Sequence, residues 1–271
     1  MSSNNKPLVT GLIPSYNHAK YIKESIQSMI DQDYENMEMI IIDDGSSDNS
    51  IEIIESMIPL CKKRFKRFEF RHRENKGVSA TLNEGIMWSK GKYLSPLASD
   101  DIALSHKTSF LIDKIENSNY PAVFGDIKRI GERNDKEPNI KEFTIHTFDE
   151  IFTLQNRPFA PSSMYKIEAL KKIGGYPVDI AVEDWYMELK FTENNNKIVS
   201  YPEVLTYYRR HEKNTSKNYE LIYNNFIKIV DNYKNHKLYF KARKLCDIYL
   251  IKISLANNCL SPTLNMKIDK I

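Results

Sequence analysis

At residues 93–101 the sequence reads Tyr93-Leu94-Ser95-Pro96-Leu97-Ala98-Ser99-Asp100-Asp101, a short apolar segment of strand length that ends in two adjacent carboxylates. Carboxylates at the end of a parallel strand face the crevice where open α/β sheets bind their ligands. They suit Mg²⁺ or Mn²⁺, which often bind through one or two carboxylates together with substrate phosphates. Asp is also a favoured N-cap residue, so the alternative is that Asp100 and Asp101 only begin the next helix.

The segments before this stretch alternate between strand and helix patterns. Apolar runs of strand length lie at 8–14, 37–42 and 68–71, and apolar residues at helical spacing follow them at 20–32, 51–58 and 78–86. The run 37–42 has almost no polar break, as expected for a strand that helices cover on both faces. Together with residues 93–97, these alternations predict an α/β fold with a doubly wound, mostly parallel sheet. We expect Ser47 or Asp48 to cap the second helix and Gly91 to end the third.

After Asp101 the alternation is less regular. Helical patterns lie at 105–116, 148–154, 166–173 and 181–192, and extended patterns lie at 122–130 and 198–208. Gly174 and Gly175 are expected to stop the helix that precedes them. Residues 131–147 are polar and contain Gly131 and Pro138, which favours a loop or hairpin. From residue 219 onward the apolar spacing is again helical.

The composition fits one large domain or one domain with an appendage. The 271 residues are 41% hydrophobic, which is enough to bury a substantial core. Charged residues make up 28% of the chain but nearly cancel to +3, so we expect no nucleic-acid partner. The three cysteines, Cys61, Cys246 and Cys259, lack metal or redox spacing, which indicates reduced thiols in a cytoplasmic protein. The polar start and the lack of an apolar run of about 18 residues predict neither a secretory leader nor a membrane-spanning helix.

Four polar clusters follow the predicted strands of the first half: Pro14-Ser15-Tyr16-Asn17, Asp43-Asp44, Asn75-Lys76-Gly77 and Asp100-Asp101. Because the carboxyl ends of parallel strands meet at one edge, these clusters describe a pocket with the donors and acceptors of a nucleotide site. A carboxylate there can accept from a base or a ribose, and Lys76 can offset phosphate charge. The isolated glycines Gly45 and Gly77 form neither a dinucleotide-binding nor a P-loop fingerprint, which disfavours a dehydrogenase or an ATPase.

The ordered set of motifs over roughly residues 7–215 resembles the family-2 inverting glycosyltransferases of GT-A fold, of the type that builds bacterial surface polysaccharides. The set comprises Pro-Ser-Tyr-Asn at 14–17, Ile-Asp-Asp-Gly-Ser-Ser-Asp at 42–48, Asn-Lys-Gly at 75–77, Leu-Asn-Glu-Gly at 82–85 and Ser-Asp-Asp at 99–101. The resemblance implies a nucleotide-sugar donor, most often linked to UDP and next to TDP, and Mn²⁺ or Mg²⁺ as cofactor. The chain departs from the family at Ala98, where many members carry an aspartate. We still expect the remaining acidic pair to bind the cation.

The same resemblance implies roles for the polar clusters. Asp44, or as second choice Asp43, would contact the nucleotide base, while Asp100 would contact the ribose and Asp101 would bind the metal. His211 would be a further metal ligand or a diphosphate contact. The other nucleotide-binding residues are expected to be Pro14, Ser15, Tyr16, Asn17, Lys76, Asn83, Ser99, Arg209 and Arg210. His18 lies next to the first cluster, but it equally suits a helix cap.

A second acidic motif follows in the acceptor half. Gly-Gly-Tyr-Pro at 174–177 precedes Val-Glu-Asp-Trp at 182–185, which resembles the family motif that carries the catalytic base. A carboxylate within about 2.6–3.2 Å of an acceptor hydroxyl can take its proton as the oxygen attacks the anomeric carbon. We therefore predict that Asp184 is the base and that Glu183 contacts the acceptor or orients it. The alternative is that both acids only favour the start of a helix.

The resemblance also implies a division of the chain. Residues 1–215 would form the GT-A domain, with a nucleotide-sugar-binding half at 1–102 and an acceptor half at 103–215, and residues 216–271 would form a C-terminal helical extension. The extension packs on the core by default, and a homodimer or a peripheral membrane contact stays open. The basic run 62–67 is a candidate for contact with an anionic membrane, although we favour a solvated helix end.

The function predicted from these assignments is sugar transfer, with inversion, to a hydroxyl of a glycan or of a lipid-linked oligosaccharide. Two other functions stay open. A nucleotidyltransferase that forms sugar nucleotides would need a glycine-rich loop after the first strand, which residues 14–17 lack. A non-catalytic scaffold that binds sugar nucleotides would not need both Asp101 and Asp184.

Overall fold

A computed structural model describes residues 6–131 and 139–256 of the chain. Its first half alternates strands and helices, as predicted, and the elements are β1 (Val9–Ser15), α1 (Ile22–Ile30), β2 (Met37–Asp43), α2 (Ser50–Arg64), β3 (Phe68–His72), α3 (Val78–Trp88) and β4 (Tyr93–Pro96). The four strands are parallel in the order β3-β2-β1-β4. Ser15 lies opposite Asp43, and Asp43 lies opposite His72, so these strands end together at one edge.

The second half completes the sheet. Its elements are β5 (Ile102–Ala103), α4 (Lys107–Glu116), β6 (Ala122–Gly131), β7 (Thr144–His146), α5 (Phe148–Phe152), β8 (Ser163–Lys166), α6 (Ile167–Lys172), α7 (Glu183–Thr192) and β9 (Ile198–Arg210). The strand order is β3-β2-β1-β4-β8-β6-β9-β5, with β7 paired to β9. β8 runs antiparallel to both β4 and β6, while β6 and β9 are parallel. Residues 132–138 of the predicted loop lie outside the described residues.

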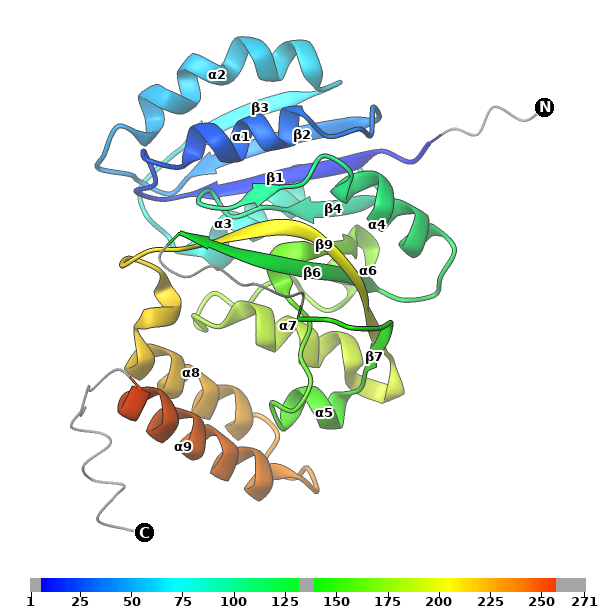
Figure 1. Ribbon diagram of the computed structural model, residues 1–271, viewed down its shortest axis with the longest axis vertical. Coiled ribbons are helices and arrows are strands. Elements are labelled where there is room, and N and C mark those ends of the chain that lie inside the picture. Colours follow the sequence, from blue (N-terminus) through cyan, green and yellow to red (C-terminus); the bar gives the residue numbers. More distant parts are fainter. Residues whose placement is uncertain (1–5, 132–138, 257–271) are drawn as a thin grey trace.

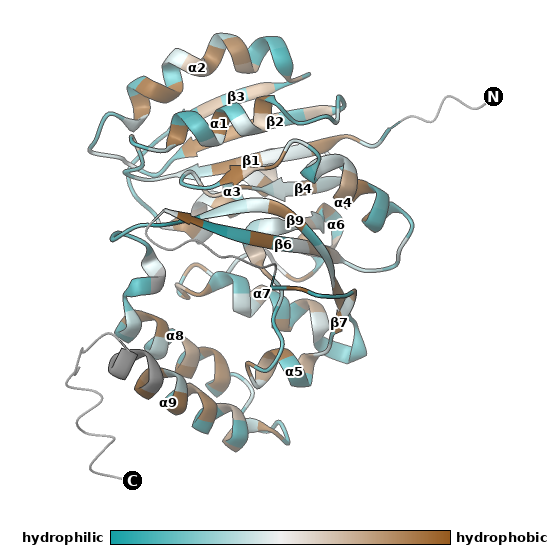
Figure 2. Ribbon diagram, in the orientation of Figure 1, coloured by the Kyte–Doolittle hydropathy of each residue, from teal (hydrophilic) through white to brown (hydrophobic). Residues whose placement is uncertain are grey.

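Two apolar cores lie on the two faces of the sheet. All seven residues of β2 are buried, which confirms the prediction that helices cover this strand on both sides. The helices α1, α2 and α4 cover one face, and α3, α6 and α7 cover the other (Figure 1). The described helices are amphipathic, so hydrophobic and hydrophilic residues alternate along them in Figure 2. Buried Cys61 and Cys246 are free thiols within these cores, and Cys259 lies outside the described residues.

Two details of the helix ends differ from the predictions. The N-cap of α2 is Asn49, although the Asp48 carboxylate accepts from the N–H of Ser50 at 3.0 Å. Gly91 does not end α3, which stops at residue 88. A Cβ atom on Gly91 would lie 2.5 Å from Thr10 Oγ1, so glycine is required there because the chain passes close to β1.

The C-terminal extension forms a helical hairpin of α8 (Tyr219–Asp231) and α9 (Tyr239–Ala256), which packs beside α7 (Figure 1). The Phe226 ring lies 4.5 Å from the Trp185 ring between centroids, and both residues belong to one buried core. Asn225 Oδ1 accepts from the N–H of Ala181 at 2.8 Å, just before α7 begins. No helix among the described residues is long and apolar enough to cross a membrane.

Candidate active site

The carboxyl ends of β1 and β4 collect on one side of the molecule, at the left in Figure 1, together with the end of β9 and the start of α7. The first-half clusters and the second acidic motif therefore lie on the same side. This is the sheet edge at which ligands are expected in open α/β folds.

Asp100 is the centre of a nearly buried cluster with two histidines. The Nε2 atom of His211 is 2.9 Å from Asp100 Oδ2, and the Nε2 atom of His18 is 3.9 Å from the same oxygen. The candidate ligand atoms of the three residues lie within 4.8 Å of one another. Two imidazoles and one carboxylate form a donor set that suits a divalent transition metal.

His18 takes part through its ring and through its backbone. The Nδ1 atom lies 2.7 Å from Ser99 Oγ, which leaves Nε2 on the side of Asp100. Burial is the main cause of a lowered pKa at His18, which Asp100 opposes and His211 reinforces. The ring is therefore neutral near pH 7, the form that can bind a metal. The His18 carbonyl also accepts from the N–H of Ile22 at 2.9 Å, so the residue starts α1 as well.

His211 is fixed by the residues that follow β9. Its N–H donates to Asn214 Oδ1 at 2.6 Å, and Asn214 Nδ2 donates to the Arg209 carbonyl at 3.2 Å. The His211 ring stacks on the Tyr21 ring with 5.0 Å between centroids and 27° between planes. The imidazole is thus oriented toward Asp100 before any ligand binds.

Arg209 and Arg210 differ in their surroundings. Arg209 Nε donates to the Asp100 carbonyl at 2.9 Å, its guanidinium pairs with Glu24, and it lies 4.9 Å from the Tyr21 ring centroid. These contacts tie β9 to the end of β4, and they do not support the predicted nucleotide contact of Arg209. Arg210 is half-buried and forms no ion pair within the described part of the chain, so its predicted phosphate contact stays a prediction.

Asp101 lies outside the histidine cluster. Its Oδ1 atom accepts from the N–H of Arg209 at 2.8 Å, and its Oδ2 atom has no partner among the described residues. Burial, and then the charge of the neighbouring aspartate, raise the pKa of Asp101 well above its usual range. Fully buried Lys107 bonds the carbonyls of Pro96 and Pro161, and burial lowers its pKa to about 7. Asp100, and not Asp101, therefore belongs to the histidine cluster, and the metal role of Asp101 stays a prediction.

Asp43 and Asn17 shape the loops at the ends of β1 and β2. The Asp43 carboxylate is fully buried and accepts from the Ser46 N–H at 2.8 Å and from the Ser46 hydroxyl at 2.6 Å. The Ser46 hydroxyl accepts from the N–H of Asn17 at 2.7 Å, and Asn17 Oδ1 accepts from the N–H of Ser47 at 2.8 Å. Ser46 contacts both oxygens of Asp43, so this carboxylate shapes the loop, and its role as the second choice for the base contact stays a prediction.

Asp44 instead faces the loop after β3. It accepts from the N–H of Lys76 at 2.9 Å and from the N–H of Gly77 at 2.8 Å, and its carboxylate pairs with Arg73. Arg73 also bonds Glu84 at 2.9 Å, so the guanidinium has a fixed orientation. The polar clusters that follow β2 and β3 are therefore joined, with Lys76 exposed at the rim.

Asn83 has a structural role. Its Oδ1 atom accepts from the N–H of Tyr176, and its Nδ2 atom donates to the Tyr176 carbonyl, both at 2.8 Å. These bonds hold the turn of Gly174 and Gly175, which have φ angles of +88° and +75°. The predicted nucleotide contact of Asn83 finds no support in this geometry. The other predicted residues lie at the same edge, with these exposures: Ser15 1%, Ser99 2% and Tyr16 48%, and Pro14 half-buried.

Glu183 and Asp184 form the first turn of α7. Burial, and then the charge of Asp184, raise the pKa of Glu183 to about 8, so Glu183 carries its proton at neutral pH. The Asp184 side chain is 38% exposed, and its Oδ1 atom accepts from the N–H of Trp185 at 2.7 Å. The protonated Glu183 can thus donate a hydrogen bond, while the neighbouring Asp184 side chain is open to solvent. The helix N-terminus also favours both acids, as the alternative prediction had it.

Tyr249 of α9 connects the two parts of the site. The charges of Arg157, Asp184 and Arg210 all act on Tyr249, whose pKa is raised mainly by burial. The end of β9 and the start of α7 therefore approach the same tyrosine. The C-terminal extension is part of the wall behind the acidic motif.

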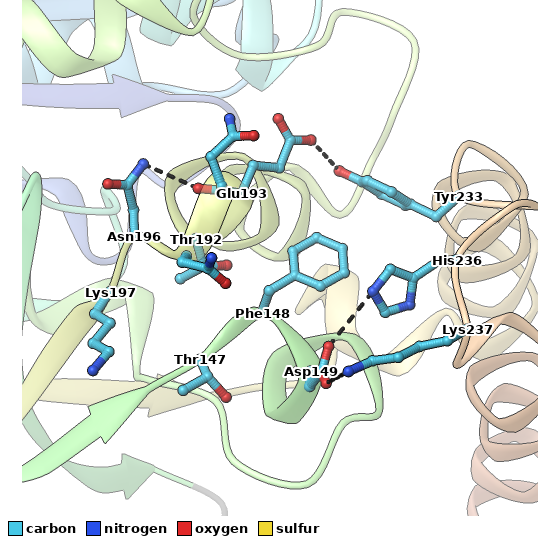
Figure 3. Close-up of a pocket in the computed structure, with 12 residues that line it drawn as sticks. Thr147, Phe148, Asp149, Thr192, Glu193, Asn196, Lys197, Tyr233, His236 and Lys237 are labelled. Atoms are coloured by element: carbon cyan, nitrogen blue, oxygen red, sulfur yellow. Dashed lines mark hydrogen bonds and ion pairs between the residues drawn. The ribbon is translucent and has the colours of Figure 1, made fainter.

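A pocket of about 560 Å³ lies at the opposite end of α7, between α5 and the connection from α8 to α9 (Figure 3). Asp149 pairs there with His236 at 3.5 Å and with Lys237 at 2.8 Å, and Glu193 accepts from the Tyr233 hydroxyl at 2.9 Å. These polar groups satisfy one another, and none of the predicted site residues lines this pocket.

A groove of about 550 Å³ runs beside α3. Its lining includes Arg73, Lys76 and Asn83, together with the exposed side chains of Met87 and Val178. It therefore adjoins the Asp44 side of the sheet edge.

Three functional candidates were not identified from the sequence: Arg73, Lys107 and Arg157. Arg73 lies two residues after a predicted strand, and Lys107 lies on an ordinary helical pattern, so neither has a local signal. Arg157 has an indirect one. Asp184 and Glu188 are four residues apart on a predicted helix, where like charges repel each other. A positive side chain from another segment would relieve this repulsion.

Comparison with known sequences identifies a family and several similar proteins. The sequence profile described as "Glycosyl transferase family 2" matches residues 11–174. The chain is 30% identical over 190 residues to an uncharacterized glycosyltransferase of Rickettsia bellii, covering 69% of this chain and 26% of that protein. It is 34% identical over 120 residues to glycosyltransferase GlyG of Streptococcus pneumoniae serotype 4, covering 44% of this chain and 38% of GlyG. The chain thus spans well under half the length of these curated relatives.

Two similar solved structures have the same fold. TarS 1–349 of S. aureus, in complex with UDP-GlcNAc, has a TM-score of 0.69 at 20% identity, covering 92% of this chain and 72% of that one. The mannosyltransferase PcManGT from Pyrobaculum calidifontis, in complex with GDP-Man and Mn²⁺, has a TM-score of 0.69 at 14% identity, covering 98% and 80%. The predicted α/β fold of GT-A type is thereby confirmed.

Proposed function

The chain belongs to glycosyl transferase family 2, and from this we propose that it transfers a sugar, with inversion, from a nucleotide-sugar to a hydroxyl group of an acceptor glycan. The observation that carries the proposal is the shared position of two different acidic sites. The Asp100 cluster and the Glu183–Asp184 pair lie on the same side of the molecule, where β4 and β9 end and α7 begins (Figure 1).

The residues of the first site fit a divalent cation. Asp100, His211 and His18 would hold it, because their ligand atoms are grouped and His18 is neutral at pH 7. Two imidazoles beside one carboxylate favour Mn²⁺ over Mg²⁺, which prefers oxygen ligands alone. When bound, the cation would supply positive charge beside the diphosphate of the donor. The Mn²⁺ complex of the similar mannosyltransferase supports this part of the proposal.

Asp184 is the proposed general base. Its carboxylate is partly exposed and can reach an acceptor hydroxyl, whereas protonated Glu183 can donate a hydrogen bond to the same acceptor. The acceptor oxygen would attack the anomeric carbon from the face opposite the diphosphate. The bond from that carbon to the diphosphate breaks as the new glycosidic bond forms, and the hydroxyl proton passes to Asp184.

UDP is the proposed nucleotide of the donor, and TDP is the next candidate. Asp44 lies with Arg73 against residues 75–77, where a carboxylate can accept from the imide N–H that uracil and thymine share. The UDP-GlcNAc and UDP complexes of TarS support a uridine donor, and the GDP-Man complex of the mannosyltransferase favours guanosine as the competing base.

The proposed acceptor is a glycan or a lipid-linked oligosaccharide of a surface polysaccharide. This part rests on family analogy, because specificity depends on loop contacts that differ among members. A scaffold without catalytic activity would share the fold, and it is the alternative that the experiment must exclude.

The experiment is calorimetric titration with UDP, TDP, GDP and ADP, each with and without Mn²⁺, followed by an assay for UDP release from UDP-sugars. We expect binding of UDP or TDP that depends on Mn²⁺, and hydrolysis or transfer of the matching sugar. Nucleotide binding without turnover on any sugar donor would favour the scaffold. No nucleotide binding under any condition would contradict the proposed donor site.

A further inference from the structure

Two carboxylates on one face of α7 require compensation. Asp184 and Glu188 are four residues apart, so they lie on the same face of the helix, where like charges repel each other. Glu188 is only 2% exposed, and a buried carboxylate needs a hydrogen-bonded partner. Burial raises the pKa of Glu188, and the charge and hydrogen bonds of its arginine partner oppose that shift and favour the ionised form.

The partner is Arg157, from the segment between α5 and β8. Its Nε and Nη2 atoms donate to the two oxygens of Glu188 at 2.7 and 3.1 Å, which is a bidentate pair. The same Nη2 atom lies 3.4 Å from Asp184 Oδ2. Glu188 therefore fixes the plane of the guanidinium, and one edge of it faces the carboxylate of Asp184.

The two carboxylates differ in access to solvent. The side chain of Glu188 is enclosed, whereas that of Asp184 is 38% exposed. The Arg157 guanidinium also lies 5.8 Å from the Trp185 ring centroid, which limits its movement further. Asp184 thus has one backbone donor on Oδ1, one cation beside Oδ2, and an exposed side that an acceptor can approach.

We propose that Arg157 is a positioning residue that places a fixed positive charge beside Asp184 and orients its carboxylate toward the acceptor hydroxyl, with Glu188 as its buried anchor. The inference rests on the proposed function, because it gives Asp184 the role of base. Arginine is suited to this position because its planar fork can bond one carboxylate with two N–H groups and still face a second carboxylate. A lysine would provide the charge without the bidentate anchor.

Other ionisable groups also act on Asp184. They are Glu183 on the same turn, Glu188 one turn later, Tyr165 of β8, Tyr176 of the glycine turn and Tyr249 of α9. Glu183 is protonated at neutral pH, and the raised pKa values of the three tyrosines keep them neutral. Arg157 is thus the positive group in direct contact with Asp184, and Glu188 is the negative group that moderates it.

The test compares the pH dependence of kcat/KM in the full chain and in the variants Arg157→Gln, Arg157→Lys and Glu188→Gln. Loss of the guanidinium charge should move the acidic limb of the Arg157→Gln profile to higher pH by about one unit. The activity of this variant should therefore fall about tenfold more on the acidic side than at pH 8. Glu188→Gln keeps the shape of the side chain but removes its negative charge, which opposes the effect of Arg157 on Asp184. The acidic limb of this variant should therefore move to lower pH. Arg157→Lys should restore most of the limb position.

A second readout does not depend on turnover. The carboxyl carbon of Asp184, assigned by its absence in Asp184→Asn, is followed by ¹³C NMR through the same pH range. We expect its titration midpoint to move to higher pH in Arg157→Gln and to lower pH in Glu188→Gln. If Arg157→Gln does not fold, Glu188→Gln alone still tests the sign.

The outcomes separate the two proposals. Unchanged midpoints and limbs in both variants, or shifts in the same direction in both, would overturn the role of Arg157. A wild-type protein with no transfer activity would overturn the proposed function, while the NMR titration would still report on the contact between Arg157 and Asp184.

Discussion

Asp100 and Asp101 are neighbours in the sequence, but their side chains enter different environments. Asp100 joins His211 and His18 at the sheet edge, whereas Asp101 turns inward to the N–H of Arg209 and toward buried Lys107. The sequence predicts a metal role for Asp101, which stays a prediction, whereas Asp100 is the member of the pair that lies beside the two histidines. The backbone conformation after β4 determines which of the two adjacent acids faces the crevice. The spacing of residues in the sequence does not predict this orientation.

A matched pair of isosteric variants tests this distinction. Asp100→Asn should weaken Mn²⁺ binding in the presence of UDP at least about tenfold, because it removes a charged ligand. Asp101→Asn should keep the affinity within about threefold, since an amide resembles the protonated acid that burial favours there. Isothermal titration with Mn²⁺ measures both values. An equal loss in the two variants would contradict the choice of Asp100.

The proposed role of Asp184 as general base leads to a separate prediction. Asp184→Asn should retain the affinity for the donor nucleotide but lower kcat by about 10²–10⁴-fold, because the amide cannot take the acceptor proton. Glu183→Gln is the control, since glutamine resembles the protonated form of Glu183 at neutral pH. Initial rates and nucleotide titrations on the same samples separate catalysis from binding. Near-normal turnover in Asp184→Asn would remove Asp184 as the base.

Among the elements, the turn between α6 and α7 provides the sharpest comparison. A Cβ atom on Gly175 would lie 2.5 Å from Asn83 Oδ1, whereas one on Gly174 would meet nothing within 4 Å. Both glycines have positive φ, so alanine costs about 1–2 kcal/mol at either position. Gly175→Ala should cost clearly more than Gly174→Ala, because it also displaces the amide of Asn83. Urea denaturation measures the two free energies, and equal losses would argue against the Asn83 contact as the cause.

The elements were largely predictable because each is encoded locally. The apolar runs located β1 to β4, β6 and β9, and the helical spacings located α1 to α9 within a few residues. The antiparallel insertion of β8 between β4 and β6 was not predictable, since local spacing does not specify which strands become neighbours. The same limit applies to the site: motif order pointed to Asp100, His211 and the α7 acids, but the contacts of Arg157 and Arg73 come from distant segments.

At the scale of the whole molecule, the helical hairpin α8–α9 shares a core with the acceptor half. Phe226 is 3% exposed and packs against Trp185, next to the proposed base. We propose that residues from 216 onward, as far as they are described, belong to the same folding unit as the acceptor half.

Two phenylalanines of the hairpin test that proposal. Phe226→Ala should lower the free energy of unfolding by about 3–5 kcal/mol and should change the fluorescence of Trp185, because it opens a cavity beside the indole. Phe240→Ala is the control, since Phe240 is 82% exposed and its loss should change stability by less than about 0.5 kcal/mol. Urea unfolding followed by tryptophan fluorescence measures both. A small effect of Phe226→Ala, or a separate unfolding transition for the hairpin, would contradict a shared unit.

The contact between Asp100 and His211 joins positions that are 111 residues apart in the chain. During synthesis on the ribosome, β1 to β4 emerge well before β9, at about 5–20 residues per second. For several seconds, therefore, the nascent sheet has one edge of β6 unpaired, and the Asp100 carboxylate lacks its histidine partner. Chaperones that bind exposed strand edges have this interval in which to act, and the capacity to bind a cation arises only when translation has passed the end of β9.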